Sequence, residues 1–394
     1  MSLLSLIFVN LGRNKIRTTL TLLSVMVALF LFCALRGVLD TLQESIKAGE
    51  QTRLVVRNAV SLVQPLPQSY KSRLQAVPGV ERVAIENWFG GQDPNDAKGF
   101  FAQFGVDDDL LPIYRDDMEI VEASPAPAAV ALPPGADPKL AAYYGEQTAC
   151  IVGRELMVKK GWKLGQTITL AGTIYPGNWP MTIRAVYRAK KKAFGEQTVF
   201  FPFRYLEQKG MNGSGWVGIY VLKLTDPKQS ATISKNVDEM FVNSSYATLT
   251  ESEQAFQAGF VSMYGNVPFL IGLLGIAVVF AILLVAANTM VMAMRERVSE
   301  FGVLKTLGFE DGTIFAMVLA EAAIITLGGG ILGALLAKYL LGGVNLGFLP
   351  PLTIYWSTAI TGMAIALTIG AVSGLIPAWQ ASRLRIVDAL RRVD

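Results

Sequence analysis

The sequence has no histidine and only two cysteines among its 394 residues. Without histidine, it cannot support His-based acid/base catalysis, a triad with a histidine base, or a zinc site with histidine ligands. The two cysteines, Cys33 and Cys150, can form neither a disulfide framework nor a Cys-only zinc site. We therefore expect a non-catalytic protein that has no catalytic residues and binds no metal or cofactor of its own.

A Gly-Lys dipeptide is also absent. A P-loop needs Gly-Lys followed by Ser or Thr, so that backbone N–H groups and the lysine can hold phosphates. Any ATP-driven role therefore predicts an ATPase on another chain, which would hold the ATP and the magnesium.

What the sequence does contain is apolar: 52% of the residues are hydrophobic, and the mean hydropathy is +0.40. This is too apolar for an ordinary soluble chain and too polar for a bundle wholly in lipid. Four segments are long and apolar enough to cross about 30 Å of hydrocarbon. We expect transmembrane helices at residues 16–36, 265–294, 313–341 and 356–380. No small-residue cleavage site follows the first segment, which favours a retained helix over a signal peptide.

Basic residues predict the orientation of these helices. They lie before the first apolar run, in the loop 295–312 and in the tail 381–394, whereas the loop 342–355 has none. By the positive-inside rule, both termini and the loop 295–312 are cytoplasmic, and residues 37–264 and 342–355 lie outside. We expect a multi-pass protein of the inner (plasma) membrane. Residues 1–15 predict an interfacial helix, with a disordered start as the alternative.

The region 37–264 predicts a large extracytoplasmic α+β domain. Strand, helix and strand patterns occur at its beginning and again at its end, and residues 111–215 between them are rich in strand patterns. We expect an α/β lobe with an inserted β-rich lobe. From Arg36 to Gly265 the chain carries 24 basic and 24 acidic residues. This balance argues against a nucleic-acid partner, which would need a concentrated basic face.

Two charged runs in this region have alternative interpretations. Lys190-Lys191-Lys192, with Arg184 and Arg188, could bind an anionic lipid or phosphate, but a solvated hairpin is favoured. The aspartates at 107–109 and 116–117 could bind calcium. Because the spacing of a calcium loop is absent, an exposed turn is favoured.

Within the predicted spans, the polar residues of interest are Glu321 and Asn288. A carboxylate in lipid costs at least about 2–3 kcal/mol, so Glu321 should face protein. A hydrogen bond between helices is favoured over a proton or ion pathway. Three pairs of glycines have the spacing of close helix contacts. These pairs are Gly272/Gly275, Gly329/Gly333 and Gly370/Gly374.

The loop between the second and third spans predicts a short amphipathic helix. Val298, Phe301 and Leu304 fall on one side of it, and Glu296 and Glu300 on the other. A helix that rests on lipid is normally rich in Lys and Arg, whereas this one is balanced in sign. The pattern therefore favours a protein partner, with the lipid surface as the alternative.

Several motifs together resemble one family. They are Asn10-Leu11-Gly12-Arg13-Asn14-Lys15-Ile16-Arg17, Glu296-Arg297 with Gly302-Val303-Leu304-Lys305-Thr306-Leu307-Gly308, Glu321-Ala322 with Gly329-Gly330-Ile331-Leu332-Gly333, Gly374-Leu375-Ile376-Pro377-Ala378-Trp379, and Asp388-Ala389-Leu390-Arg391. In these motifs the chain resembles the MacB-like permeases of ABC transporters, a superfamily that includes the lipoprotein-releasing permeases and FtsX. The resemblance extends over nearly the whole chain.

The resemblance implies a permease subunit that pairs with a second copy or a paralogue and sits on a dimer of cytoplasmic ABC ATPases. ATP hydrolysis would move the MacB-like core domain at 37–264 and so drive export or extraction of a hydrophobic, peptide or lipid-linked substrate. A membrane-fusion or lipoprotein-carrier protein outside would be a further partner, and membrane lipids surround the spans. The residues implied to couple the chain to the ATPase are Glu296, Arg297, Glu300, Phe301, Gly302, Leu304, Lys305 and Gly308.

Two departures from the family bear on this assignment. MacB carries an ATPase at its N-terminus, which this sequence lacks, and FtsX has a much smaller outer domain. The alternative function is an FtsX-like regulator that transmits movement to a periplasmic partner without transport.

Overall fold

The computed structural model describes residues 9, 12–48, 52–96, 99–126, 130–191, 194–210, 215–262, 266–344 and 352–385. The interfacial helix predicted at 1–15, and residues 386–394 of the predicted tail, fall largely or wholly outside these ranges. The chain divides into two compact units. The helical unit comprises residues 1–41, 266–344 and 352–394, and the sheet unit comprises 42–265 and 345–351.

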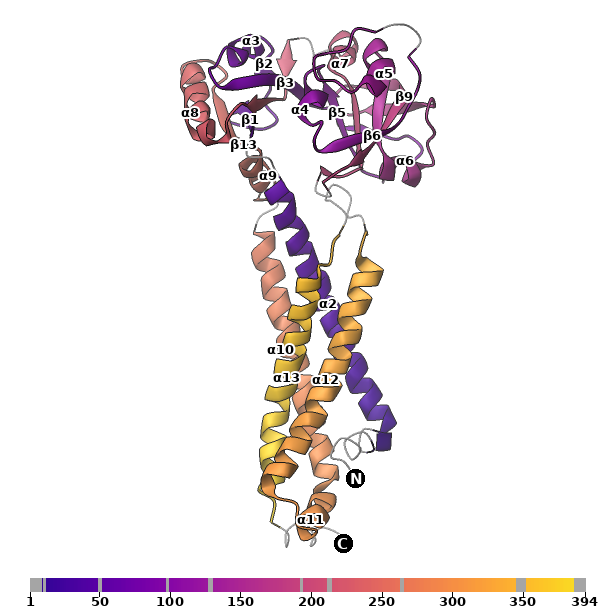
Figure 1. Cartoon of the computed structure of the whole chain (residues 1–394), viewed down its shortest axis with the longest axis vertical. Coiled ribbons are helices and arrows are strands. Elements are labelled where there is room, and N and C mark those ends of the chain that lie inside the picture. Colours follow the sequence, from indigo (N-terminus) through magenta and orange to yellow (C-terminus); the bar gives the residue numbers. More distant parts are fainter. Residues whose placement is uncertain are drawn as a thin grey trace. The chain divides into compact units, whose positions relative to one another are not determined.

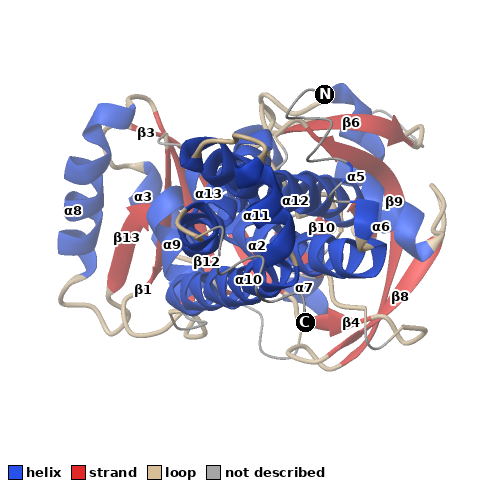
Figure 2. Ribbon diagram, turned by 90° about the horizontal axis from the view of Figure 1, so that it is seen from below, coloured by secondary structure: helices blue, strands red, loops and turns tan. Residues whose placement is uncertain are grey.

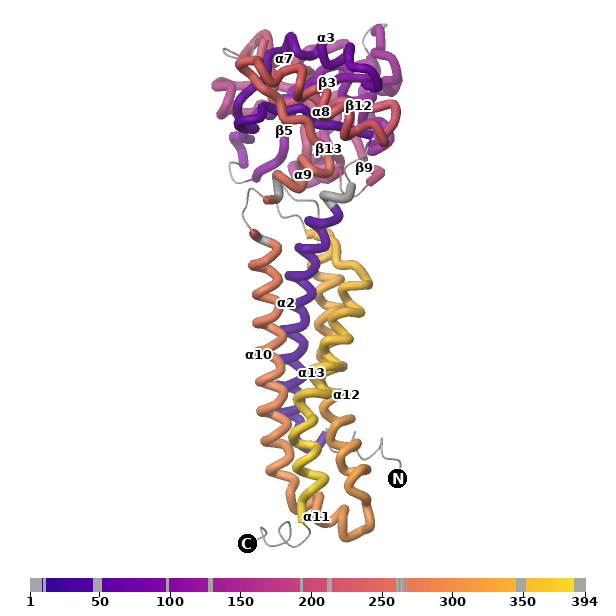
Figure 3. The backbone as a smooth tube through the Cα atoms, turned by 90° about the vertical axis from the view of Figure 1, so that its left-hand side faces the viewer, coloured from indigo at the N-terminus to yellow at the C-terminus, as the bar shows by residue number. Residues whose placement is uncertain are grey.

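Four long helices make up most of the helical unit, and a short one joins two of them. The long helices are α2 (Lys15–Ala48), α10 (Val267–Glu296), α12 (Asp311–Leu341) and α13 (Trp356–Ser382), and the short one is α11 (Val298–Thr306). Each long helix is apolar enough, over enough residues, to cross a membrane. They run side by side in both side views (Figures 1 and 3). The prediction of four long apolar helices is confirmed, although α2 continues well beyond residue 36.

Glycines let α12 lie close to α2 and α13. A Cβ added at Gly329 would lie 2.9 Å from the carbonyl oxygen of Leu22 in α2, and one added at Gly374 of α13 would lie 2.9 Å from the Cβ of Ala322 in α12. These two pairs therefore make the close helix contacts that their spacing predicts. The α10 pair does not, because a Cβ at Gly272 would meet no atom within 4 Å.

The sheet unit begins and ends in an α/β portion. Its strands are β1 (Arg53–Asn58), β3 (Val80–Trp88), β12 (Ile219–Leu224) and β13 (Thr248–Ser252), and its helices are α3 (Tyr70–Gln75) and α8 (Ser230–Phe241). The strands pair antiparallel in the order β13-β1-β12-β3. The two predicted strand–helix–strand stretches thus interleave in one portion.

The same sheet continues into a second, β-rich portion. Its strands are β4 (Gly91–Gln92), β5 (Ala102–Val106), β6 (Met118–Ala123), β7 (Ala149–Gly153), β8 (Thr167–Gly172), β9 (Gly177–Ala189) and β10 (Thr198–Pro202). Its helical turns are α4 (Leu110–Ile113), η1 (Pro138–Leu140), α5 (Ala141–Gly145), α6 (Arg154–Lys160) and α7 (Phe203–Lys209). The remaining elements of the unit are β2 (Leu66–Pro67), β11 (Trp216–Val217), η3 (Pro227–Gln229) and α9 (Glu253–Ser262).

Among the described residues, these strands form one 11-stranded sheet, in which β3 continues as β5-β10-β7-β9-β8-β4 and β6 pairs with β9. Two of its strands, β4 and β5, precede residue 111, where the inserted lobe was expected to begin. They join it because β5 pairs in parallel with β10, and β4 pairs with β8.

Apolar residues cover both faces of this sheet. Val83 and Ile85 belong to one buried cluster and Ala84 to the other, and Phe201 and Phe200 are divided in the same way. Successive side chains of a strand point to opposite faces, so the two clusters are the cores above and below the sheet. Helices α3 and α8 lie beside β13 and β1, whereas α5 and α6 lie beside β6, β9 and β8 (Figure 2).

Candidate functional site: the charged cluster around α11

The chain reverses direction through two sharp turns on either side of α11. Arg297 separates α10 from α11, and its N–H donates to the carbonyl of Met294 at 3.1 Å. After α11, Gly308 takes a φ of +93°, which favours glycine. The N–H of Phe309 then donates to the carbonyl of Leu304 at 3.1 Å, as at helix ends closed by a left-handed residue. Gly308 therefore shapes the turn that leads into α12.

An apolar base fixes α11 to the neighbouring helices. Phe301 is buried in a cluster with Ile314 and Met317 of α12 and with Ala378 of α13. Gly302 is buried as well, and Leu304 is partly buried against the same cluster. Phe301 and Gly302 thus anchor α11, and Leu304 is partly buried beside them.

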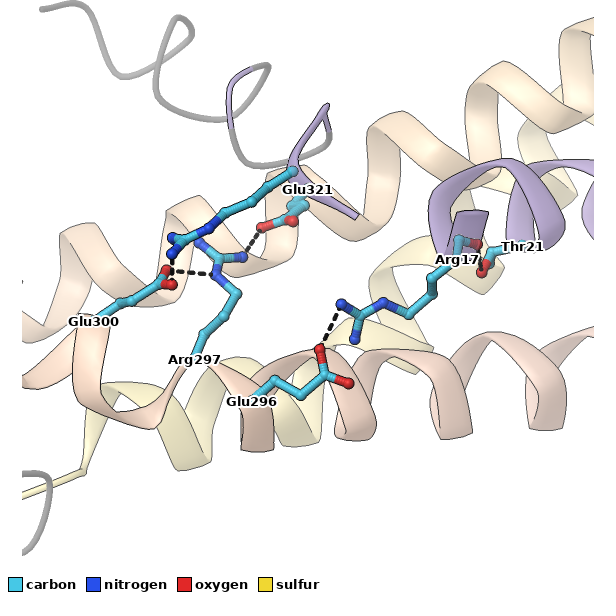
Figure 4. A network of polar contacts seen from close by, with 7 residues as sticks. Arg17, Thr21, Glu296, Arg297, Glu300 and Glu321 are labelled. Atoms are coloured by element: carbon cyan, nitrogen blue, oxygen red, sulfur yellow. Dashed lines mark hydrogen bonds and ion pairs between the residues drawn. The ribbon is translucent and has the colours of Figure 1, made fainter. Parts of the chain in front are cut away.

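Arg297 forms the centre of a charged network above this base (Figure 4). Its Nη1 donates to Glu321 Oε2 at 2.8 Å, and its Nε donates to Glu300 Oε2 at 3.2 Å. Its guanidinium also lies 5.2 Å from the centre of the Phe301 ring. Glu321 of α12 therefore faces protein, as predicted, and its partner is the residue that joins α10 to α11.

Residues at the start of α2 and just before it make two further ion pairs in this region. Arg17 Nη2 lies 2.7 Å from Glu296 Oε2, and Arg13 pairs with Glu300. The Thr21 hydroxyl donates to the carbonyl of Arg17 at 2.9 Å. A pocket of about 280 Å³ lies among these groups. Its charged lining consists of Arg13, Arg17, Glu296, Arg297, Glu300 and Glu321. With three arginines and three glutamates, the lining is balanced in charge.

Lys305 attaches the far end of α11 to the end of α13. Its Nζ donates to the carbonyl oxygens of Ser382 at 2.6 Å and Leu384 at 2.9 Å, and it lies 2.8 Å from Asp311 Oδ1. The last carbonyls of a helix lack partners within the helix, and a cation there is stabilising. Lys305 is therefore another anchor of α11.

Two apolar residues are exposed on α11 and just after its end. Val303 is 49% exposed and Leu307 is 71% exposed, and Gly308 lies beside them at the surface. The sequence alone did not predict Val303 and Leu307 as separate site residues, nor the pairing of Arg17 with Glu296. An apolar pair at i, i+4 on the side opposite Phe301 was the signal that could have identified the first two.

Asn288 does not join this site. It lies on α10 and its side chain is exposed. The structure therefore separates the two polar residues that were predicted together in the spans.

Several residues of the charged runs in the sheet unit are paired with opposite charges. Lys71 Nζ lies 2.6 Å from Asp107 and 2.7 Å from Asp109, and Asp117 is buried. The expectation of an exposed turn is therefore wrong for Asp117. Lys191, from the lysine run, lies 2.6 Å from Asp117 Oδ1; Lys192 is outside the described residues. Among the residues that the structure describes, no cluster of three or more His, Cys, Asp or Glu side chains is placed to hold a metal ion.

Comparison with known proteins places both halves of the chain in one group. Residues 18–240 match the family described as the MacB-like periplasmic core domain, and residues 269–386 match the FtsX-like permease C-terminal family. The first match covers more than half of the chain. The chain belongs to the MacB-like ABC transporter permeases. This permease is thus a membrane protein with a domain outside the cytoplasm.

Individual relatives match shorter regions of the permease. The uncharacterized ABC transporter permease YvrN of Bacillus subtilis (strain 168) is 33% identical over 104 residues, 26% of this chain and 25% of the relative. The macrolide export ATP-binding/permease protein MacB 1 of Yersinia pestis bv. Antiqua (strain Antiqua) is 25% identical over 240 residues, 56% of this chain and 34% of the relative. The chain therefore spans between a quarter and about a third of these curated relatives.

Solved structures of the same group resemble the permease more loosely. The periplasmic region of MacB from Actinobacillus actinomycetemcomitans aligns with a TM-score of 0.39 and 10% identity, over 55% of this chain and 95% of that one. The extracellular domain of YknZ from Gram-positive bacteria aligns with a TM-score of 0.35 and 12% identity, over 51% and 100%.

Proposed function

We propose that this permease couples ATP hydrolysis by a separate ATPase to movement of its extracytoplasmic domain. The movement drives export or extraction of a hydrophobic, peptide or lipid-linked substrate. The 394 residues hold no Gly-Lys for a P-loop, so an ABC ATPase dimer supplies the ATP and magnesium site. The curated MacB relatives are described as macrolide export proteins, which supports an apolar substrate class.

The observation that supports this proposal is the construction of α11. Its inner side is fixed by Phe301, Arg297 and Lys305 to the other helices of the unit. Its outer side presents Val303 and Leu307. A partner that binds this outer side and moves α11 therefore also moves the ends of the helices to which α11 is attached.

A polar route between the helices has little support in the described residues. The carboxylate of Glu321 is paired with Arg297, and Asn288 lies exposed on α10. A hydrated pathway needs a continuous series of polar groups. We therefore propose that the substrate is taken up from the outer leaflet or from outside the membrane. The further partners are a second copy or paralogue, and a membrane-fusion or lipoprotein-carrier protein.

Substitution of the outward face of α11 tests the coupling. Leu307→Ser and Val303→Ser together should reduce co-purification of the ATPase at least about tenfold, which corresponds to about 1.4 kcal/mol of lost binding. Val242→Ser, an equally exposed apolar site in the sheet unit, is the matched control. Co-purification at the wild-type level would contradict docking at α11. A complex that hydrolyses ATP and activates a periplasmic enzyme without moving substrate would favour the FtsX-like regulator.

The proposed orientation, with both termini and α11 cytoplasmic, has a separate test. Ser72 in α3 and Thr306 in α11 are both exposed. Ser72→Cys should react with a membrane-impermeant maleimide in intact cells or spheroplasts, and Thr306→Cys should react only in inverted vesicles. The reverse pattern would overturn the orientation.

A further inference from the structure

A second charged cluster lies in the sheet unit, away from α11. Arg53 is only 3% exposed, and its Nε donates to Glu253 Oε2 at 2.7 Å while its Nη1 donates to Asp117 Oδ2. The Tyr114 hydroxyl donates to the other oxygen of Glu253 at 3.0 Å. Lys191 Nζ lies 2.6 Å from the other oxygen of Asp117. We call Arg53, Tyr114, Asp117, Lys191 and Glu253 the Arg53 cluster.

The members of the Arg53 cluster come from three parts of the sheet unit: its beginning, its end and its β-rich portion. Arg53 is the first residue of β1, the strand that follows α2 in the chain. Glu253 is the first residue of α9, the helix that precedes α10. Asp117 directly precedes β6, and Lys191 follows β9, both in the β-rich portion. One guanidinium therefore connects the beginning and the end of the sheet unit to its second portion.

We propose that the Arg53 cluster is a joint that, together with the pairing of β3 with β5, makes the sheet unit respond as one body to movement of either α2 or α10. This inference rests on the proposed function, because it assigns a path to the movement that ATP would drive. Arg53 acts as a positioning residue. It holds α9 to β1, and it holds both to the turn at Asp117.

The chemistry of arginine suits this role. A guanidinium presents its N–H groups in a rigid planar fork, so Arg53 can bond carboxylates in two fixed directions at once. Apolar side chains of similar volume would fill the space but would not impose these directions. Burying ions costs several kcal/mol for each ion, and pairing them with good geometry offsets that cost. Removal of the arginine would therefore leave two carboxylates without the partner that fixes them.

The charges around the joint are balanced. Arg53 and Lys191 are positive, and Asp117 and Glu253 are negative. Glu86 is a third carboxyl nearby, and burial together with the negative charge of Glu253 raises its pKa to about 8. Glu86 is thus mostly protonated at pH 7, and burial also raises the pKa of the Tyr114 hydroxyl, which remains neutral. The joint therefore holds two positive and two negative charges at neutral pH.

The test compares Arg53→Met with a matched control in the full chain, reconstituted with its ATPase in lipid nanodiscs. The control is Lys160→Met, because Lys160 is another buried cation of the sheet unit, 3.1 Å from Asp93 and 2.9 Å from Asp96. Lys160 ends α6 and its two partners follow β4, so its ion pairs involve neither β1 nor α9. If Arg53→Met does not accumulate in the membrane, Arg53→Lys replaces it, since lysine keeps the charge and loses the fork.

Two measurements separate the joint from a general effect on stability. Spin labels at Ser72→Cys in α3 and Val158→Cys in α6 report the distance between the two portions, and both sites are exposed. The distance distribution should broaden at least twofold in the Arg53 variant and should keep its width in the control. A non-hydrolysable ATP analogue should change the rate of amide hydrogen exchange in β6 and β9 of the wild type and of the control. In the Arg53 variant this response should be lost, while α11 still responds.

The two measurements test the joint and the proposed function separately. Equal distance distributions in the Arg53 variant and the control would overturn the joint, and so would an intact ATP response of β6 and β9 in the Arg53 variant. If the wild type shows no ATP response anywhere, the proposed function fails. The spin-label distances still test the joint in that case, because they do not depend on ATP.

Discussion

Two arginines, one in each unit, bridge a pair of carboxylates, and their surroundings differ. Arg53 is 3% exposed and lies within the sheet unit. Arg297 has a side chain 14% exposed and lines an open pocket of about 280 Å³ with five other charged residues. Water cannot replace the partners of the first arginine, whereas it can reach those of the second. The Arg53 pairs therefore suit a fixed connection, and the Arg297 pairs suit a connection that rearranges.

The largest effect should come from removing the more buried arginine. Arg53→Met should lower the free energy of unfolding of the sheet unit by about 3–5 kcal/mol, because it leaves Asp117 and Glu253 buried without their shared cation. Arg297→Met should cost only about 1–3 kcal/mol, because Glu300 and Glu321 can be hydrated from the pocket. Thermal unfolding of the two full-length variants in the same detergent measures the difference. Equal losses would contradict the distinction between the two arginines.

The second prediction extends the comparison to glycines of the helical unit. A Cβ at Gly333 would lie 2.9 Å from the backbone nitrogen of Phe30 in α2, and it would also meet the carbonyl of Met26. Gly333→Leu should therefore destabilise the helical unit by about 3 kcal/mol, because a backbone cannot give way as a side chain can.

Gly272→Leu is the control, because a Cβ there meets nothing within 4 Å. It should unfold at nearly the wild-type temperature. Loss of stability at Gly272 as large as at Gly333 would show that the outward side of α10 is packed against another protein surface.

The third prediction uses the carboxyl group of Glu86 to probe the sheet unit. Its pKa is about 8 in the folded chain, against an ordinary value of 4.5. Between these values the folded state holds a proton that the unfolded state has lost, so stability falls as the pH rises from about 5 to 8. Glu86→Gln should remove this decline and should therefore be more stable than the wild type at pH 8. Unfolding midpoints at pH 5.5 and pH 8 measure it, and a parallel decline in the variant would contradict the assignment.

The smallest effect is expected at the exposed edge of the Arg53 cluster. Lys191 pairs with Asp117, but its side chain is 42% exposed. Lys191→Met should therefore change the free energy of unfolding by less than about 1 kcal/mol. Raising the salt concentration should weaken the wild type slightly and leave the variant unchanged. A loss comparable to that of Arg53→Met would contradict the smaller role of this exposed pair.

The helical unit was the more predictable part of the chain. Length and apolar content alone locate four membrane-length helices, and glycine spacing locates the contacts at Gly329 and Gly374. The same spacing failed at Gly272, because it does not tell which side of a helix faces a neighbour. For α11, the amphipathic pattern placed Phe301 on the apolar side, but it did not show that this side is internal and that Leu307 is the exposed one.

Long-range pairing limited the prediction of the sheet unit. Arg53 bonds partners 64 and 200 residues away in the sequence, and no local pattern signals such contacts. The start of the inserted lobe was placed at residue 111 because the strand patterns before it repeat those at the end of the region. Pairing of β5 with β10, which is also long-range, assigns β5 to the β-rich portion. Alternating apolar and polar residues predict individual strands, but they do not predict which strands pair in the sheet.

The position of β1 in the sheet has a consequence for how the protein is made. Its two neighbours, β12 and β13, are the last strands of the unit to leave the ribosome. During synthesis β1 therefore has both edges unpaired until nearly the whole unit has been translated. Unpaired apolar strands of this kind are prone to aggregate, and non-local pairing slows folding. Biogenesis of this permease should thus depend on a holding chaperone that acts between insertion of α2 and emergence of β13.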